Sequence, residues 1–152
     1  MKSKWRFSEE EAKAIADTIE YDLLTKPRIA FKIDAKWNKQ FPNQPGVYAI
    51  FEKKKFVYIG ETADVQERMR DIRRTYNHTF RRKLGKIRLK AELQGNLFSK
   101  EIESELDDYM VTHLEFTCHS LTFGRKEVEA HIVEKRKGEL FNSESFRGKK
   151  KK

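Results

Sequence analysis

Two short apolar segments that are joined by a lysine-rich turn, and followed at once by a helix pattern, constrain this chain more than any other feature. The first segment is GVYAIF, residues 46–51, and the second is FVYIG, residues 56–60. Their β-branched and aromatic residues are typical of strands, and the link between them is short enough for a hairpin. The sequence therefore predicts two antiparallel strands joined by a tight turn.

The second segment leads directly into residues with a helical period. Val65, Met69 and Ile72 recur at spacings of four and three, which places them on one apolar stripe of a helix. Thr62 is placed to cap this helix, and Arg68 borders its apolar stripe. The sequence thus predicts a strand, a turn and a helix in direct succession.

This succession of elements resembles the core of the GIY-YIG nuclease family. Residues 46–48 (GVY) stand where the family has its GIY, and residues 58–60 are an unaltered YIG. Arg68 follows the YIG tyrosine by ten residues, as the active-site arginine of the family does. Further on, Glu129 begins a helix pattern similar to the family's E-x-x-φ-φ (φ apolar), and Asn142 matches its closing asparagine. The resemblance spans about two-thirds of the chain.

The resemblance implies an α+β domain with a small three-stranded antiparallel sheet flanked by helices. Residues 114–118 alternate like a third strand that would pair with the hairpin. The nuclease-like domain is expected over residues 45–146, followed by a basic, disordered tail over residues 147–152. Before it, residues 1–44 are interpreted as an N-terminal extension packed on the core. The whole chain of 152 residues is otherwise expected to form one domain.

The N-terminal extension contains its own helix signal. Ser8 and Glu11 are spaced as a capping box, in which each side chain bonds the other's backbone. Ala12, Ile15 and Ile19 follow at helical spacing. A helix is therefore expected over residues 8–24, after which residues 28–33 are a short strand or an extended arm.

The function that the resemblance implies is metal-dependent hydrolysis of phosphodiester bonds in DNA. Tyr48 would act as general base, and Tyr58 would hydrogen-bond water or phosphate beside it. Arg68 would bind a non-bridging phosphate oxygen through its planar guanidinium group. Glu129 would hold one divalent cation, Mg²⁺ or Mn²⁺, and Asn142 would orient the site. No second acid has a matching spacing, so a single-metal site is expected.

One position departs from the family pattern. Many members carry a histidine or tyrosine one helical turn after the arginine, and this chain has Ile72 there, which cannot transfer a proton. Either Tyr48 suffices as the base, or His78 reaches back into the site from just beyond the helix. The plainer alternative is that His78 only caps the next helix.

The charge of the chain indicates a polyanionic partner. Lysine and arginine exceed the acidic residues enough to give a formal net charge of +9. The basic residues of the hairpin turn and of residues 73–90 are expected to contact phosphate. They are Lys53, Lys54, Lys55, Arg73, Arg74, Arg81, Arg82, Lys83 and Lys86.

Other properties narrow the setting but leave alternatives open. A single cysteine, Cys118, excludes an internal disulfide and suits a reducing compartment, and no segment is apolar and long enough to span a bilayer. A soluble, cytoplasmic protein is therefore expected. A DNA repair or restriction nuclease, a homodimer, an RNA substrate and a non-catalytic nucleic-acid-binding module on the same scaffold all remain compatible with the sequence.

Overall fold

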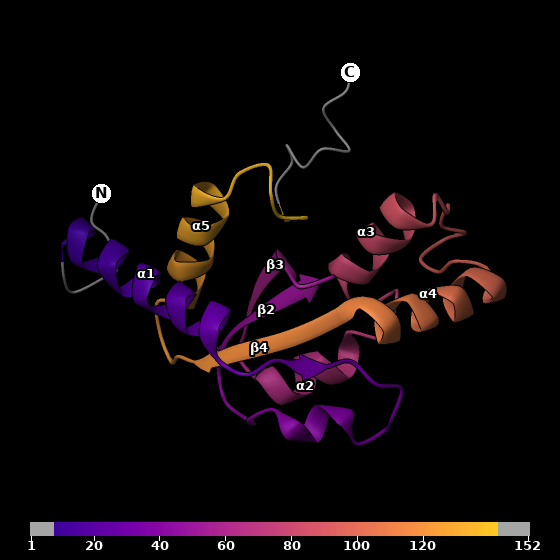
Figure 1. Ribbon diagram of the computed structural model, residues 1–152, viewed down its shortest axis with the longest axis horizontal. Coiled ribbons are helices and arrows are strands. Elements are labelled where there is room, and N and C mark those ends of the chain that lie inside the picture. The colour runs from indigo at the N-terminus through magenta and orange to yellow at the C-terminus, as the bar shows by residue number, and fades with distance from the viewer. Residues whose placement is uncertain (1–7, 143–152) are drawn as a thin grey trace.

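The computed structural model describes residues 8–142, which form a sheet with helices on both faces (Figure 1). The chain runs through α1 (Glu9–Thr25), β1 (Ile29–Ala30), a 3-10 helix η1 (Trp37–Gln40), β2 (Gly46–Glu52), β3 (Lys55–Thr62), α2 (Val65–Asp71), α3 (Thr79–Arg88), α4 (Lys100–His113), β4 (Leu114–Ser120) and α5 (Arg125–Lys135). The predicted α+β class is confirmed, and the expected tail at residues 147–152 lies outside the described residues.

The sheet differs from the prediction in its number of strands. Three strands were expected, whereas the described residues form four antiparallel strands in the order β1-β4-β2-β3. The additional strand, β1, has only two residues, which pair with Phe116 and Glu115 of β4. The predicted hairpin is present as β2 and β3, and the predicted third strand, β4, pairs with β2.

The central strand β2 is buried on both faces, because two apolar clusters cover the sheet. Tyr48 and Ile50 face a cluster that includes apolar side chains of α2, α3 and α4. Val47, Ala49 and Phe51 face the opposite cluster, which contains α1 and α5. The alternation of β2 side chains thus creates a three-layer arrangement, with the sheet in the middle.

The N-terminal helix begins as its sequence predicts. The Ser8 side chain accepts a hydrogen bond from the Glu11 backbone N–H at 3.1 Å, and the Ser8 N–H donates to the Glu11 carboxylate at 2.9 Å. Ala16, Ile19 and Leu23 then bury their side chains against the sheet. This packing makes α1 part of the same core as the hairpin.

The start of α2 corrects one residue of the sequence prediction. The cap is Asp64, whose carboxylate accepts from the Glu67 N–H at 3.2 Å, and not Thr62. The Thr62 hydroxyl oxygen instead accepts from the Asp64 N–H at 3.1 Å, which shapes the turn before the helix. The predicted stripe of Val65, Met69 and Ile72 is buried, as expected for the inner face of α2.

Candidate active site

Tyr48 lies at the centre of the sheet, opposite Gly60 of β3. A Cβ atom at Gly60 would lie 2.2 Å from the Tyr48 Cζ and 2.3 Å from its hydroxyl oxygen, which no real side chain tolerates. The ring of Tyr48 therefore passes directly over a backbone position that must be glycine. Tyr58 lies nearby, with a distance of 6.3 Å between the two ring centroids. The GVY and YIG segments thus place two tyrosines together.

His78 joins this pair through a buried hydrogen bond. Its Nε2 lies 2.9 Å from the Tyr48 hydroxyl oxygen, while its Nδ1 accepts from the Phe80 backbone N–H at 3.1 Å as the cap of α3. Burial, followed by the charges of Arg68 and Arg82, lowers the pKa of His78 well below its usual value, so the ring is neutral.

The two bonds of His78 also define its tautomer. Because Nδ1 accepts a hydrogen bond, the single proton of the neutral ring lies on Nε2, and Nε2–H donates to the Tyr48 hydroxyl oxygen. The proton of the Tyr48 hydroxyl is then available to another group. The sequence left open whether His78 reaches the site or only caps the next helix. In the structure it does both, because it caps α3 and contacts Tyr48.

Arg68 extends from α2 toward the loop that follows it. Its Nη1 donates to the Asn77 carbonyl oxygen at 3.1 Å. Within residues 8–142 it has no carboxylate partner, although Glu67 and Asp71 lie close in sequence. Its charge acts to lower the pKa of both Tyr48 and Tyr58. Arg68 therefore offers an uncompensated cation beside the two hydroxyls.

Ile72 does not line this site. It is fully buried in the apolar cluster that also contains Met69, Tyr48 and Tyr58. Ile72 is the C-cap of α2 and keeps helical dihedral angles, so its side chain continues the buried stripe of Val65 and Met69. The position that differs from the family pattern is therefore occupied by a core residue, and the histidine that contacts Tyr48 comes from the loop beyond it.

Glu129 supplies the carboxylate of the site from the first half of α5. Burial, and secondarily the nearby Glu61 carboxylate, raise its pKa to about 7, against a smaller opposing effect of Lys126. Glu129 has no hydrogen-bond or ion-pair partner among the described residues. By contrast, Glu61 is paired with Arg125 at 3.1 Å. An unpaired, half-buried carboxylate of this kind favours a cation.

The two tyrosine hydroxyls are held in their protonated form. Burial, and then the neighbouring Tyr58, raise the pKa of Tyr48 far above its usual value, and these effects outweigh Arg68. Burial and the Glu129 charge raise the pKa of Tyr58 to about 12. Both hydroxyls therefore carry their protons at neutral pH. The negative charge of Glu129 acts to raise the pKa of both tyrosines.

The Asn142 side chain hydrogen-bonds the backbone of β3. Its Oδ1 accepts from the Ile59 N–H at 3.0 Å, and its Nδ2 donates to the Ile59 carbonyl oxygen at 2.7 Å. These two bonds imitate a strand pairing along β3, the edge strand that carries Tyr58. Asn142 thereby holds the backbone next to Tyr58, and its expected role in orienting the site stays a prediction.

The nine basic residues expected to contact phosphate separate into buried and exposed groups. Arg81 is only 2% exposed, and its guanidinium bonds Glu103 at 2.8 Å and Asp107 at 2.9 Å. The prediction that it contacts phosphate is therefore wrong, because its charge is already neutralised inside the protein. The half-buried Arg82 donates to the Thr75 carbonyl at 2.8 Å, and Lys83 donates to the Phe141 carbonyl at 2.7 Å. The exposed members are Lys53, Lys54, Lys55, Arg73, Arg74 and Lys86.

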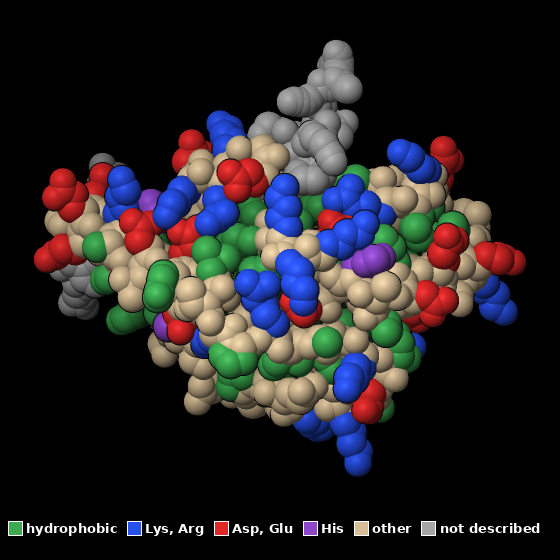
Figure 2. Space-filling model, in the orientation of Figure 1, with side chains coloured by type: hydrophobic (Ala, Val, Ile, Leu, Met, Phe, Trp, Pro, Cys, Tyr) green, Lys and Arg blue, Asp and Glu red, His purple; other side chains and the backbone are tan. Residues whose placement is uncertain are grey.

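Charge is unevenly distributed over the visible surface. Figure 2 shows many lysine and arginine side chains across the middle of the molecule, while acidic side chains gather toward the two ends. Those ends carry α1, whose first turn contains three glutamates, and α4, whose first turn contains Glu101 and Glu103. A polyanion would therefore be attracted to the middle of this face and repelled by its ends.

The donor groups of the site suit a hard divalent cation. The described residues contain no cluster of three or more histidine, cysteine or acidic side chains that could enclose a metal ion. Glu129 would consequently be the main protein ligand, and water and phosphate oxygens would complete the shell, which is the usual manner of Mg²⁺. The raised pKa of Glu129 agrees, because a bound cation would replace its proton.

Sequence reasoning missed Glu61, which follows the YIG tripeptide directly. Its carboxylate approaches Glu129 closely enough to raise the pKa of that residue, and Arg125 holds it from the start of α5. Strand alternation could have indicated part of this arrangement from the sequence. Residues alternate in facing along a strand, so Glu61 shares the face of Ile59, which packs in the same cluster as the α5 residue Val128.

Comparisons with protein-family models, with curated proteins and with solved structures give no match to this chain. Among the described residues, no helix has both the length and the apolar character needed to cross a membrane. A functional assignment consequently depends on the chemistry of the site.

Proposed function

We propose that this protein is a divalent-metal-dependent endonuclease that hydrolyses phosphodiester bonds in DNA, with a site of the GIY-YIG kind. The observation that carries the proposal is the unpaired Glu129 carboxylate, whose pKa is raised to about 7 and whose charge acts on two buried tyrosine hydroxyls. Arg68, which has no carboxylate partner among the described residues, supplies the opposite charge. Partly buried charges without a partner of opposite sign are costly, and they concentrate at functional sites.

Each residue has a role that follows from its surroundings. Arg68 would bind a non-bridging oxygen of the scissile phosphate and stabilise the charge that develops there. Glu129 would hold one Mg²⁺ or Mn²⁺ ion, which when bound supplies positive charge to the phosphate oxygens and to water. His78 would hold the Tyr48 hydroxyl in place through Nε2–H. Tyr48 would have to lose its own proton before its oxygen could accept one from the attacking water.

General-base action by Tyr48 has one clear requirement. Its pKa is raised by burial, so the hydroxyl does not lose its proton unless positive charge is added beside it. The hydrogen bond from His78 favours the phenolate once it forms, because a donor to the oxygen stabilises its negative charge. His78 itself is a poor candidate for the base, since Nε2 already carries the proton.

The test is cleavage by the purified protein of a panel of duplex, flap, junction and single-stranded DNA and RNA, with Mg²⁺ or Mn²⁺. Glu129→Gln is expected to abolish cleavage while leaving DNA binding in EDTA nearly unchanged. Glu134→Gln is the matched control, because Glu134 is an exposed acid on the same helix. Cleavage by Glu129→Gln at the wild-type rate would refute the proposal.

A second variant addresses the role of Tyr48. Tyr48→Phe keeps the ring over Gly60 and removes only the hydroxyl, so single-turnover cleavage is expected to slow by about a hundredfold or more. The rival function is a non-catalytic nucleic-acid-binding module, which the raised pKa of Tyr48 favours. Binding without cleavage of any substrate in the panel would support that rival.

A further inference from the structure

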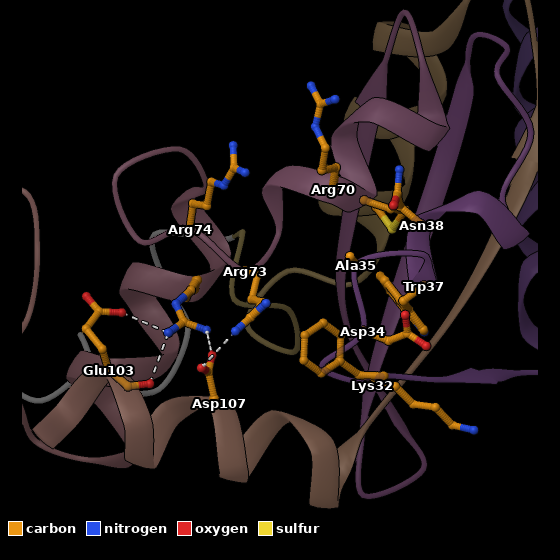
Figure 3. Close-up of a pocket in the computed structure, with 13 residues that line it drawn as sticks. Lys32, Asp34, Ala35, Trp37, Asn38, Arg70, Arg73, Arg74, Glu103 and Asp107 are labelled. Carbon is orange, nitrogen blue, oxygen red and sulfur yellow. Dashed lines mark hydrogen bonds and ion pairs between the residues drawn. The ribbon is translucent and has the colours of Figure 1, made fainter. Parts of the chain in front are cut away.

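A cleft of about 440 Å³ opens beside the C-terminal end of α2. Its walls come from α2, from the residues that follow it, from α4 and from the segment between β1 and η1 (Figure 3). Four cationic side chains besides the buried Arg81 line it. They are Lys32, Arg70, Arg73 and Arg74, and the acidic part of the lining consists of Asp34, Glu103 and Asp107.

The arginines of this cleft are paired only weakly. Arg73 lies 3.6 Å from Asp107, Arg74 lies 3.8 Å from Asp71, and both side chains remain almost half exposed. Arg70 pairs with Glu67 on the surface of the same helix. Exposed pairs of this kind contribute little to stability, so these cations can exchange a carboxylate for a phosphate at small cost.

The same loop carries an exposed aromatic ring. Tyr76 is 49% exposed and stands two residues after Arg74. Its neighbour Asn77 accepts the hydrogen bond from Arg68, and the next residue, His78, bonds Tyr48. Tyr76 is therefore the chain neighbour of the residue that hydrogen-bonds Arg68, and adjacent Cα atoms are about 3.8 Å apart.

Buried bonds hold this loop in position. Thr75 is 1% exposed, and its hydroxyl donates to Glu103 at 2.7 Å while accepting from Arg81 at 3.0 Å. Arg82 donates to the Thr75 carbonyl at 2.8 Å. The backbone beside Tyr76 is therefore fixed from within, which reduces the entropy that its ring would lose on binding a ligand.

We propose that Tyr76 and the cleft arginines bind an unpaired segment of DNA next to the cleaved bond. This inference rests on the proposed function, and it specifies the class of substrate. Cations that follow a phosphate chain, together with an aromatic ring on which a base can stack, are the combination that binds single strands. The bases of a duplex are already stacked and offer no free face to Tyr76. A substrate with a single-stranded part next to the cut is thereby favoured over a continuous duplex.

The test measures binding in EDTA by fluorescence anisotropy, so that cleavage plays no part. The probes are a short oligothymidylate, a blunt duplex of the same length and a duplex with a single-stranded overhang. The wild-type protein is expected to prefer the two probes with unpaired bases. Tyr76→Ala should weaken binding to those probes by about tenfold and to the duplex by less than about twofold, since stacking on one base is worth 1–3 kcal/mol.

Two further variants separate stacking from other effects. Tyr76→Phe keeps the ring and should bind nearly as the wild type does. Tyr21→Ala removes a tyrosine of α1 that is 70% exposed, far from the loop in sequence, and should change nothing. Equal losses on all probes, no loss with Tyr76→Ala, or tighter binding to an oligouridylate than to oligothymidylate would each overturn the inference. Inactivity in the cleavage panel would refute the nuclease function and leave these binding results intact.

Discussion

Glu129 illustrates how the site is set at the scale of single residues. Its carboxylate is partly withdrawn from solvent, and Glu61 adds a like charge nearby. Neither effect is relieved by a hydrogen bond among the described residues. By contrast, the buried Glu20 of α1 is paired with Lys135 and Arg136 at the C-terminal end of α5. The fold therefore satisfies one buried acid and leaves the other in an unfavourable state, which a cation would relieve.

This unfavourable state predicts a pH-dependent stability. The pKa of Glu129 is about 7 in the folded protein and 4.5 in the unfolded chain, so between these values the folded state holds the proton more tightly. Stability from this residue is therefore lost as the pH rises from about 5 to 8. Glu129→Gln should be more stable than wild type at pH 8 by roughly 1–2 kcal/mol, after allowance for solvent screening, and equal to it at pH 4.

Urea unfolding in EDTA at the two pH values measures this difference. Glu134→Gln, an exposed change on the same helix, should show no such dependence. A Glu129→Gln stability difference that is the same at pH 4 and pH 8 would contradict the raised pKa.

Gly60 gives a second prediction at this scale. In Gly60→Ala the new methyl group would meet the Tyr48 ring, so the ring must move and its bond to His78 must lengthen or break. A loss of roughly 1–3 kcal/mol in unfolding free energy is expected from this overpacking. The Nε2 signal of His78 in a nitrogen-detected NMR spectrum should shift as well.

A double-mutant cycle shows whether the Tyr48 ring is the cause. In a Tyr48→Ser background the added methyl group has room, so Gly60→Ala should cost much less there. An equal cost in both backgrounds would mean that the strain lies elsewhere, for instance in the strand backbone.

The positions of Tyr48, Tyr58 and Arg68 could be anticipated from the sequence because strand alternation and helix spacing fix them locally. The burial of Arg81 could not, because it depends on Glu103 and Asp107 from a helix that starts about twenty residues later. A basic residue on a helix has the same sequence pattern whether its partner is a phosphate or a buried carboxylate. Only the tertiary packing separates the two cases.

The hairpin is the element on which the site depends, and its turn is strained. Lys53 and Lys54 have φ angles of 53° and 73°, in the left-handed region that lysine rarely adopts. Glu52 pairs with Lys55, so the two strained residues form the whole turn. Two positive φ angles match a type I′ turn, for which asparagine and glycine are the favoured residues. Of these two lysines, Lys54 has a charge partner in the structure, the Glu115 carboxylate at 3.3 Å.

Replacing both residues should therefore raise stability and lower DNA affinity. Lys53→Asn with Lys54→Gly is expected to increase the unfolding free energy by about 1–2 kcal/mol, because the exposed Lys54–Glu115 pair that it removes contributes less than the strain that it relieves. The same variant should bind DNA more weakly, as two exposed cations are lost. Chemical denaturation and anisotropy measure the two effects on one preparation.

Lys55→Asn serves as the control for this turn. Lys55 lies in β3, outside the two strained positions, so its substitution removes a charge without relieving strain. It should weaken binding without any gain in stability. No gain in stability from the double variant would contradict the strained turn, and unchanged affinity would show that the turn lysines do not contact DNA.

At the level of elements, the sequence predicted the hairpin, α1 and the α2 stripe, because each depends on local periodicity or capping. The sequence signal for β1 was weaker, since two residues cannot show an alternation. Ile29 becomes part of a strand only through its pairing with Phe116, a long-range contact. For the same reason, the sequence did not decide whether residues 28–33 are a strand or an extended arm.

At the scale of the whole molecule, the face in Figure 2 combines acidic ends with a basic middle, and this arrangement should govern the affinity of the protein for DNA. The net charge of +9 attracts any polyanion, but only cations that touch phosphate release counterions when DNA binds. A charge that is merely present on the surface changes long-range attraction without changing the salt slope in proportion. The slope of log affinity against log salt therefore distinguishes contacts from background.

The last prediction uses two triple variants with the same change in net charge. Arg73, Arg74 and Lys86 are exposed cations of the expected binding face, whereas Lys13, Lys39 and Lys100 are exposed lysines outside the predicted set. Alanine at the first three should reduce the salt slope by about 2 to 3, from 0.7–0.9 for each phosphate contact. Alanine at the second three should lower affinity slightly and keep the slope.

Arg81→Met completes this comparison, because it removes a charge that is buried and paired. It should leave the slope unchanged and lower stability by about 3–5 kcal/mol, since Glu103 and Asp107 would lose their buried partner. If the two triple variants instead have the same salt slope, the affinity for DNA depends only on the total charge of the molecule. The loop after α2 would then have no direct contact with phosphate.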